Sequence, residues 1–261
     1  MSKGKRVKQK TKRLKNNKTI ILNILLVFFV SMMVYGLIEI CRWYINKIEN
    51  EKISNEIAEV ITVIETEKSE ENQEGIKYDI DFTTIKKKNE DAVAFLKVNG
   101  TNIETIVVKG NDNDYYLNHN FEKKLNKGGW IFADYKNKIN GKDKNLVIYG
   151  HNMKDGSMFG TLDNILKKEW YNNEENYIIR FITEREEQQY EVFSVYQVID
   201  EDYYIKTEFA KDEFQKFIKK IESRSIKDFD MDITEKDSIL TLSTCANDNR
   251  YRVVLHAKRI K

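Results

Sequence analysis

The chain has 261 residues, of which 44 are Lys or Arg and 42 are Asp or Glu, with two cysteines, three histidines and no proline. This length allows one sizeable core, and a composition of 41% hydrophobic and 11% aromatic residues excludes a disordered chain. So few cysteines and histidines exclude a disulfide scaffold and a cysteine-rich zinc site.

The near-neutral net charge of +2 hides an asymmetry between the N-terminus and the rest of the chain. Residues 1–18 hold nine basic residues and no acidic one, which leaves 35 basic and 42 acidic residues, a net charge of −7, for the remainder. This excess of acidic residues argues against nucleic-acid binding by the main body of the protein.

A stretch of 20 uncharged residues, Thr19 to Ile38, follows the basic tail. As a helix it would be about 30 Å long, the thickness of a bilayer hydrocarbon core. Lys and Arg on one side match the positive-inside rule, and Trp43 and Tyr44 stand where interfacial aromatics are expected. The alternatives are a buried helix or a cleaved signal peptide, whose apolar part is normally shorter. We expect a cytoplasmic tail over 1–18, a transmembrane anchor over 19–42, and the rest of the chain outside the cell.

Residues 43–75 are expected to form a helical stalk and a linker. Apolar residues recur there at the spacing of one helical face, at Ile53, Ile57, Val60, Ile61 and Ile64. The Glu-rich segment 65–74, followed by a glycine, is typical of a linker. The main folded domain is therefore expected to comprise residues 76–261.

The pattern of this last part predicts a mainly β domain with inserted helices. After a short helix at Phe82–Asn89, strand signals follow at 93–98, 105–109, 129–135, 145–149, 177–183, 189–198, 238–244 and 251–259. Two helical insertions are predicted at 161–170 and 208–223; the second has an apolar face of Phe214, Phe217, Ile218 and Ile221. Eight strands with few helices between them predict a closed or nearly closed barrel.

A cysteine ends the strand that begins at Ser238. Alternation places Ser243 and Cys245 on one face of this strand and Thr244 on the other. A buried structural role is the common one for a cysteine. An unpaired thiol outside the cell is open to oxidation, however, so its presence favours a role in chemistry. The neighbours Ser243 and Thr244 are candidate substrate-binding residues.

A histidine stands at the exit of the strand predicted at 145–149, in the sequence Tyr-Gly-His151. Most histidines in such places are surface or turn residues. The competing histidines are His119, in a polar loop, and His256, inside the last predicted strand. Neither follows a glycine that would let the backbone turn and present the ring, so His151 is the better candidate for general acid or base.

Two arginines, Arg250 and Arg252, open the last predicted strand. Most such arginines simply reach solvent. If this strand pairs with the cysteine strand through a turn at 246–249, an arginine at its start lies near the thiol of Cys245. A guanidinium there would favour the thiolate and could donate a hydrogen bond to an oxyanion.

Together, the Thr-Leu-Ser-Thr-Cys245 strand, the Tyr-Gly-His151 element and the Arg252-Val-Val element resemble sortases, specifically class B sortases. The resemblance runs from about residue 79 to 258 and includes the segments at 113–117 and 151–160. The helix predicted at 208–223 is similar to the class B insertion. One departure is the lack of a proline before Val107, which bears on the conformation of a loop and not on catalysis.

The resemblance implies an eight-stranded barrel and a cysteine transpeptidase that joins secreted proteins to the cell wall of a Gram-positive bacterium. By the family's roles, Cys245 attacks the carbonyl after Thr in a C-terminal sorting pentapeptide and forms a thioacyl enzyme. His151 protonates the leaving amine and activates the incoming amine of a peptidoglycan precursor, and Arg252, rather than Arg250, stabilises the oxyanion. No cofactor is expected, and no metal is implied, since no acidic cluster has the spacing of a calcium loop.

Two other classes of function stay open. A hydrolytic cysteine peptidase acting on cell-wall peptides would use the same side chains, but papain-like enzymes place cysteine before histidine, whereas His151 precedes Cys245. A non-enzymatic, membrane-tethered binding domain would need neither residue.

Overall fold

The computed structural model describes residues 3–65, 76–199, 201–245 and 251–261, with side chains from residue 18 onward except those of Glu65 and Cys245. The chain divides into two units, residues 1–48 and 49–261. Helix α1 (Lys3–Ala58) accounts for the first unit and continues into the second.

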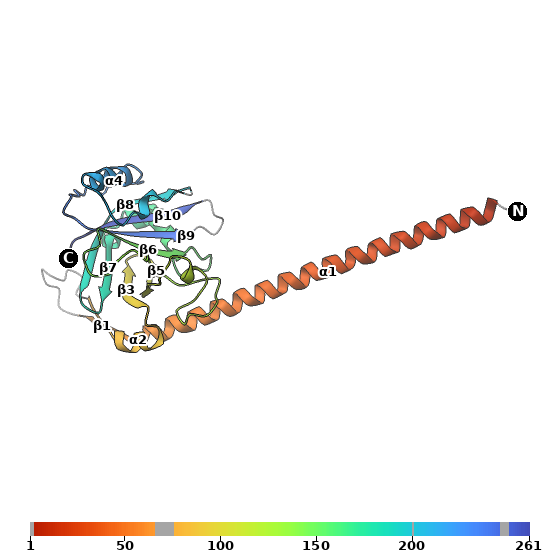
Figure 1. The fold of residues 1–261 in the computed structure, drawn as a ribbon, viewed down its shortest axis with the longest axis horizontal. Coiled ribbons are helices and arrows are strands. Elements are labelled where there is room, and N and C mark those ends of the chain that lie inside the picture. The colour runs from red at the N-terminus through yellow and green to blue at the C-terminus, as the bar shows by residue number, and fades with distance from the viewer. Residues whose placement is uncertain (1–2, 66–75, 200, 246–250) are drawn as a thin grey trace. The chain divides into compact units, whose positions relative to one another are not determined.

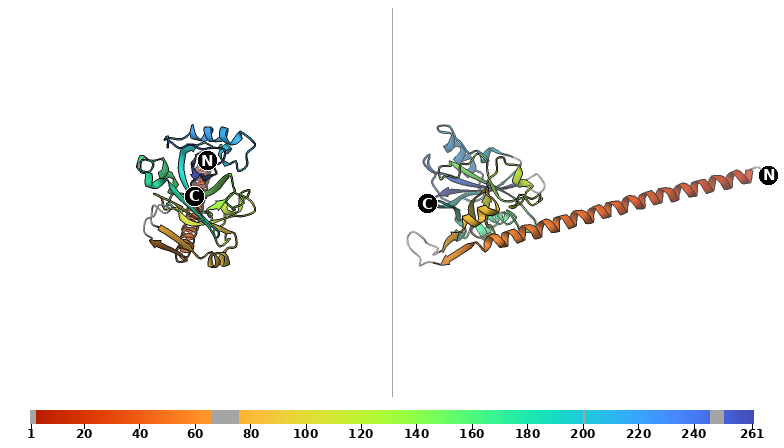
Figure 2. Two further views of the ribbon diagram at one scale, coloured as in Figure 1. Left: turned by 90° about the vertical axis from the view of Figure 1, so that its left-hand side faces the viewer. Right: turned by 60° about the horizontal axis from the view of Figure 1, so that its bottom comes forward.

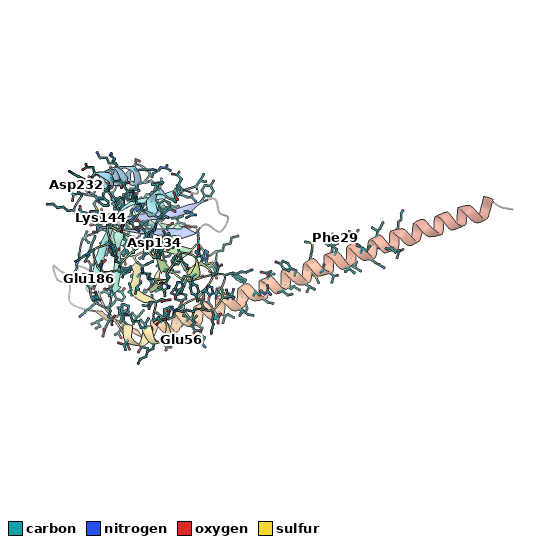
Figure 3. The ribbon with its side chains drawn as sticks, in the orientation of Figure 1. Phe29, Glu56, Asp134, Lys144, Glu186 and Asp232 are labelled. Carbon is teal, nitrogen blue, oxygen red and sulfur yellow. The ribbon has the colours of Figure 1, made fainter. Side chains whose placement is uncertain are left out.

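The first unit carries the apolar stretch on α1. This helix is long and apolar enough to cross a membrane, and none of its most apolar segment is buried. Phe29, labelled in Figure 3, is one of these exposed side chains. Exposed apolar surface of this extent on a helix marks a site of contact with membrane or protein.

The last turns of α1 belong to the second unit. Ile53 and Ile57 are buried in an apolar cluster with Phe82 and Ile85 of helix α2 (Phe82–Lys88). The predicted helical stripe is therefore right for these two residues.

The predicted stalk helix is wrong beyond Ala58. Residues Ile61–Glu65 form strand β1, which pairs antiparallel with β2 (Ile76–Ile80). Four consecutive residues at 61–64, Ile-Thr-Val-Ile, are β-branched and favour the extended conformation over the helix. Most of the predicted linker, residues 66–75, lies outside the described residues.

The remaining eight strands close into a barrel, as predicted (Figures 1 and 2). Their order around the barrel is β10-β8-β7-β3-β4-β5-β6-β9, with β9 pairing back to β10. The strands are β3 (Ala92–Val98), β4 (Glu104–Val108), β5 (Phe132–Ala133), β6 (Asn145–His151), β7 (Ile178–Thr183), β8 (Glu187–Val198), β9 (Ile239–Cys245) and β10 (Arg252–Arg259). Every predicted strand segment overlaps one of these strands, with ends that differ by a few residues.

Strand β5 is shorter than the segment predicted at 129–135. Gly129 lies in a turn with φ of +57°, and Trp130 donates its backbone N–H to the carbonyl of Tyr116 in a loop, 2.9 Å away. The backbone N–H of Trp130 is thus paired outside the barrel strands, whereas the carbonyl of Ile131 accepts from Val108 of β4 at 3.1 Å.

Alternation along β9 separates two cores. Leu240 and Leu242 point into the barrel, where they pack with residues such as Leu96 and Phe181. Thr241 and Ser243 point outward and are covered on that side.

Helix α4 (Glu213–Glu222) forms this cover over β8 and β10, on the side of the barrel opposite to α2 and β1 (Figures 1 and 2). Its predicted apolar face is buried, and it begins five residues later than predicted, after Asp212 in a left-handed conformation.

The other predicted insertion, 161–170, is not one helix. It consists of the 3-10 turn η2 (Leu162–Leu166) and the short α3 (Lys168–Tyr171), because Lys167 between them is extended. The remaining short turns are η1 (Tyr115–Leu117), η3 (Glu174–Tyr177) and η4 (Tyr203–Ile205).

Candidate active site

Strands β6 and β9 are parallel neighbours, and their last residues are paired. The register runs from Asn145 beside Ile239 to His151 beside Cys245. Neighbouring strands lie about 4.8 Å apart, so the two backbones are adjacent at one edge of the barrel although 94 positions separate the residues in sequence. The barrel thus brings the predicted nucleophile and the predicted acid or base together.

Strand β10 flanks β9 on its other side, antiparallel. The ladder includes the pair Val254 and Ser243, and continuing this register by two residues sets Arg252 opposite Cys245. The backbone N–H of Val253 donates to Thr244 Oγ1 at 2.9 Å, which holds the two strand ends together. Arg252 is half-buried and its strand also pairs with β8. Cys245 therefore lies between the strands that carry His151 and Arg252.

Arg250 and the predicted turn at 246–249 lie outside the described residues. The choice of Arg252 over Arg250 stays a prediction.

A backbone carbonyl orients the His151 ring. Its Nε2 lies 2.8 Å from the carbonyl oxygen of Leu117, at the end of η1. A carbonyl oxygen only accepts, so Nε2 carries the proton and Nδ1 is the nitrogen available to exchange one. The segment that follows η1 is itself held in place, because Asn126 donates its backbone N–H to the carbonyl of Asn118 at 2.9 Å. Sequence reasoning missed Leu117, because every residue has a backbone carbonyl and nothing in the sequence shows which one accepts from His151.

Gly150 is required for space and not for a turn, which corrects the expectation from sequence. Its φ is not positive, in contrast to Gly156 in the loop that follows. A Cβ at position 150 would lie 2.7 Å from the ring of Phe159, which is completely buried. The loop that carries Phe159 folds back onto His151, whose carbonyl accepts the N–H of Phe159 at 2.9 Å.

The other two histidines are occupied elsewhere. The His119 ring is half-buried and stacks on Tyr115, with ring centroids 4.0 Å apart. His256 is completely buried between the hydroxyls of Thr241 and Tyr196, and burial lowers its pKa to about 3. Neither is paired with Cys245.

Ser243 and Thr244 are buried and hydrogen bonded within the protein. Ser243 Oγ lies 3.1 Å from the hydroxyl of Tyr204, and Thr244 Oγ1 accepts from Val253. Their geometry supports a role in fixing the end of β9, and it gives no support to direct contact with substrate.

In the described part of the chain, no group of three or more His, Cys, Asp or Glu side chains comes together in a way that could hold a metal. The one cysteine whose side chain is described, Cys41, is exposed on α1.

Comparison with known proteins identifies the fold. The family model described as Sortase domain matches residues 96–260. Sortase B of Staphylococcus aureus (strain NCTC 8325) is 36% identical over 184 residues, covering 69% of this chain and 75% of that protein.

Solved structures give the same result. A Staphylococcus aureus sortase B–substrate complex superposes with a TM-score of 0.65 at 35% identity, covering 69% of this chain and 84% of that one. Sortase B from Bacillus anthracis in complex with AAEK1 gives a TM-score of 0.70 at 34% identity, covering 84% of this chain and 99% of that one.

The chain belongs to the sortase family, whose members are cysteine transpeptidases that attach proteins to the cell wall. Within the family it is a class B sortase. The resemblance seen in the sequence and the predicted eight-stranded barrel are both confirmed.

Proposed function

We propose that this sortase is anchored in the cell membrane by residues 19–42, with the catalytic domain outside, and cleaves a C-terminal sorting signal of secreted proteins after Thr. Cys245, His151 and Arg252 carry the reaction, and an amine of a peptidoglycan precursor accepts the protein. The pairing of His151 with Cys245 at the ends of β6 and β9 is the observation that carries this proposal.

In the first half-reaction the Cys245 sulfur attacks the carbonyl carbon after Thr and forms a tetrahedral oxyanion. The Arg252 guanidinium stabilises that negative charge, because it is cationic and its strand flanks that of the nucleophile. As the peptide C–N bond breaks, His151 gives a proton to the leaving amine and a thioester remains on Cys245.

In the second half-reaction the incoming amine attacks the thioester. His151 takes the proton that this amine loses, and the Cys245 thiolate leaves. The bond from Nε2 of His151 to the Leu117 carbonyl keeps the ring in one tautomer through both steps, with Nδ1 as the exchanging atom.

The anchored location rests on the first unit of the chain. A helix with an exposed apolar stretch follows nine basic residues, which is the pattern of an anchor with its N-terminus in the cytoplasm. Wall precursors and secreted proteins meet outside the membrane, so this topology puts the site where its substrates are.

Transfer, hydrolysis and simple binding are separated by one experiment. The full chain in detergent micelles is incubated with a library of sorting-type pentapeptides, with and without an added amine, and products are identified by mass spectrometry. A product in which the peptide is cleaved after Thr and joined through Thr to the added amine supports the proposal. Hydrolysed product alone would support a peptidase, and no product would support a binding domain. The Cys245→Ala variant is the control for each reaction.

A further inference from the structure

A concave surface lies at the far end of β6 from His151. It is a groove of about 530 Å³ between the loop at 136–144, the segment at 207–211 that leads to α4, and Glu235. Strand β6 has seven residues, so this groove and the catalytic edge are about 20 Å apart. No step of the proposed reaction uses it. We call it the lysine groove.

The charges that line the lysine groove are predominantly positive. Five lysines and no arginine border it, against three acidic residues. These lysines are Lys136, Lys138, Lys142, Lys144 and Lys211. The chain after residue 18 has a net charge of −7, so the groove is a local exception to the charge of the body around it.

The exposed lysines of the groove have no anionic partner among the described residues. Among the residues that the structure describes, the exposed ammonium groups of Lys138, Lys142 and Lys211 make no ion pair. Other lysines of the domain do pair, as Lys97 does with Glu104 and Lys206 with Glu213. Exposed lysines elsewhere, such as Lys168 and Lys236, also make no ion pair within the described residues, so the groove is distinguished by the convergence of its lysines on one concave surface.

The loop that presents two of these lysines is held in a costly conformation. Asp143 accepts the backbone N–H groups of Lys138 at 2.7 Å and Ile139 at 2.8 Å, and its carboxylate also accepts from Asn137. Ile139 has φ of +51°, a left-handed conformation that is rare for a β-branched residue. A strained backbone conformation persists only where the surrounding contacts hold it in place, and such conformations are common at binding sites.

Lys144 and Phe214 also line the groove. The Lys144 ammonium donates to the carbonyl oxygens of Glu235, at 2.7 Å, and of Asp237, and lies 4.0 Å from the centre of the Phe214 ring. Burial lowers its pKa. Lys144 is labelled in Figure 3. The Lys144 ammonium is thus already hydrogen bonded within the protein, which leaves Lys138, Lys142 and Lys211 to contact a ligand.

We propose that the lysine groove binds an anionic polymer through its phosphodiester groups. The lysine ammonium is a point charge that binds phosphate oxygens without a fixed geometry, and five lysines line the groove. Its volume exceeds that of one phosphate group, so adjacent groups of a chain can enter together. The partly buried ring of Phe209 offers an apolar wall for the carbon linker between them.

Such binding would hold the enzyme against an anionic polymer of the cell envelope while the catalytic edge stays open. The proposal does not depend on the roles assigned to the catalytic residues, and it is tested by binding without turnover.

The first test measures affinity for a defined probe. A fluorescein-labelled glycerol phosphate oligomer is titrated with the full chain in zwitterionic nanodiscs, and anisotropy is recorded. The groove variant carries Lys138→Gln, Lys142→Gln and Lys211→Gln. We expect it to bind at least about tenfold more weakly than the wild type, since three charge contacts are removed. Its turnover of short peptides should be unchanged.

A matched control variant removes the same charge elsewhere. It carries Lys77→Gln, Lys87→Gln and Lys168→Gln, three exposed lysines outside the groove. Its affinity should stay within about twofold of wild type, because these lysines do not contact the oligomer. Both variants lose the same net charge, so the difference between them measures the contribution of the groove and not general attraction. Equal weakening in both variants would overturn the proposal.

The second test locates the contact. Lysines are acetylated with and without the oligomer and quantified by mass spectrometry, which reads the basic tail separately from the groove. Protection of Lys138, Lys142 and Lys211 supports the proposal. Protection confined to residues 3–18, or protection by anionic lipid vesicles and not by the oligomer, would refute it.

Discussion

Acid should destabilise this protein through one buried histidine. His256 donates from Nδ1 to Thr241 Oγ1, 2.9 Å away, because the Thr241 hydroxyl itself donates to Asn145 Oδ1. Its Nε2 then accepts from the Tyr196 hydroxyl at 3.0 Å. Protonation would place a charge in a fully buried site and oppose two donors at Nε2, and burial is what lowers the pKa to about 3.

The size of the effect follows from linkage. Between its ordinary pKa of 6.5 and about 3, His256 is protonated in the unfolded chain and neutral in the native one. The unfolded state then binds one more proton, so the free energy of unfolding falls by about 1.4 kcal/mol for each pH unit lost. The contribution is complete above pH 6.5, and two units of acidification remove about 3 kcal/mol. That is a large share of the roughly 5–15 kcal/mol typical of a domain.

The assay is urea unfolding of the full chain in detergent micelles from pH 7.5 to 4.5. It is followed by the fluorescence of Trp130 and Trp170, which are both buried in the barrel unit. A His256→Gln variant keeps an amide for hydrogen bonding and does not titrate, so its stability should fall more gently with pH than that of the wild type. All carboxylates titrate in both proteins and cancel in the comparison. Equal slopes would refute the reasoning.

Three further predictions concern the catalytic edge. Cys245→Ala should abolish thioacyl formation, seen by intact-mass spectrometry, without changing the circular dichroism; substantial turnover would exclude Cys245 as nucleophile. Arg252→Ala should slow single-turnover acylation by at least about 100-fold, the usual cost of an oxyanion donor, while Arg250→Ala stays within about tenfold and Arg252→Lys rescues in part; the reverse order would assign the role to Arg250. Gly150→Ala should cost about 1–3 kcal/mol of stability through overpacking against Phe159 and should lower activity; adding Phe159→Leu should restore part of both, and no rescue would show that space at position 150 is not the constraint.

Local patterns in the sequence were enough for most of the elements, and the resemblance to sortases indicated the class of enzyme. The uncharged run from Thr19 to Ile38 has the length of a bilayer core, and alternation or helical spacing located eight strands and the buried face of α4. These properties depend on neighbours within one or two turns of the chain, which is why they can be predicted. The stalk prediction failed at Ile61 because a helical spacing was counted where β-branched residues favour a strand.

Only the tertiary structure decided which residues distant in sequence become neighbours in space. The pairing of His151 with Cys245 depends on a parallel register between strands 94 positions apart, which no local pattern encodes. The Leu117 carbonyl that orients His151 is chemically the same as any other carbonyl in the chain, and only the folded loop selects it. The lysine groove likewise joins residues near 140, 210 and 235 that are unremarkable in sequence. Side-chain periodicity follows from local backbone geometry, whereas register and proximity follow from closing the barrel, where many distant contacts form together.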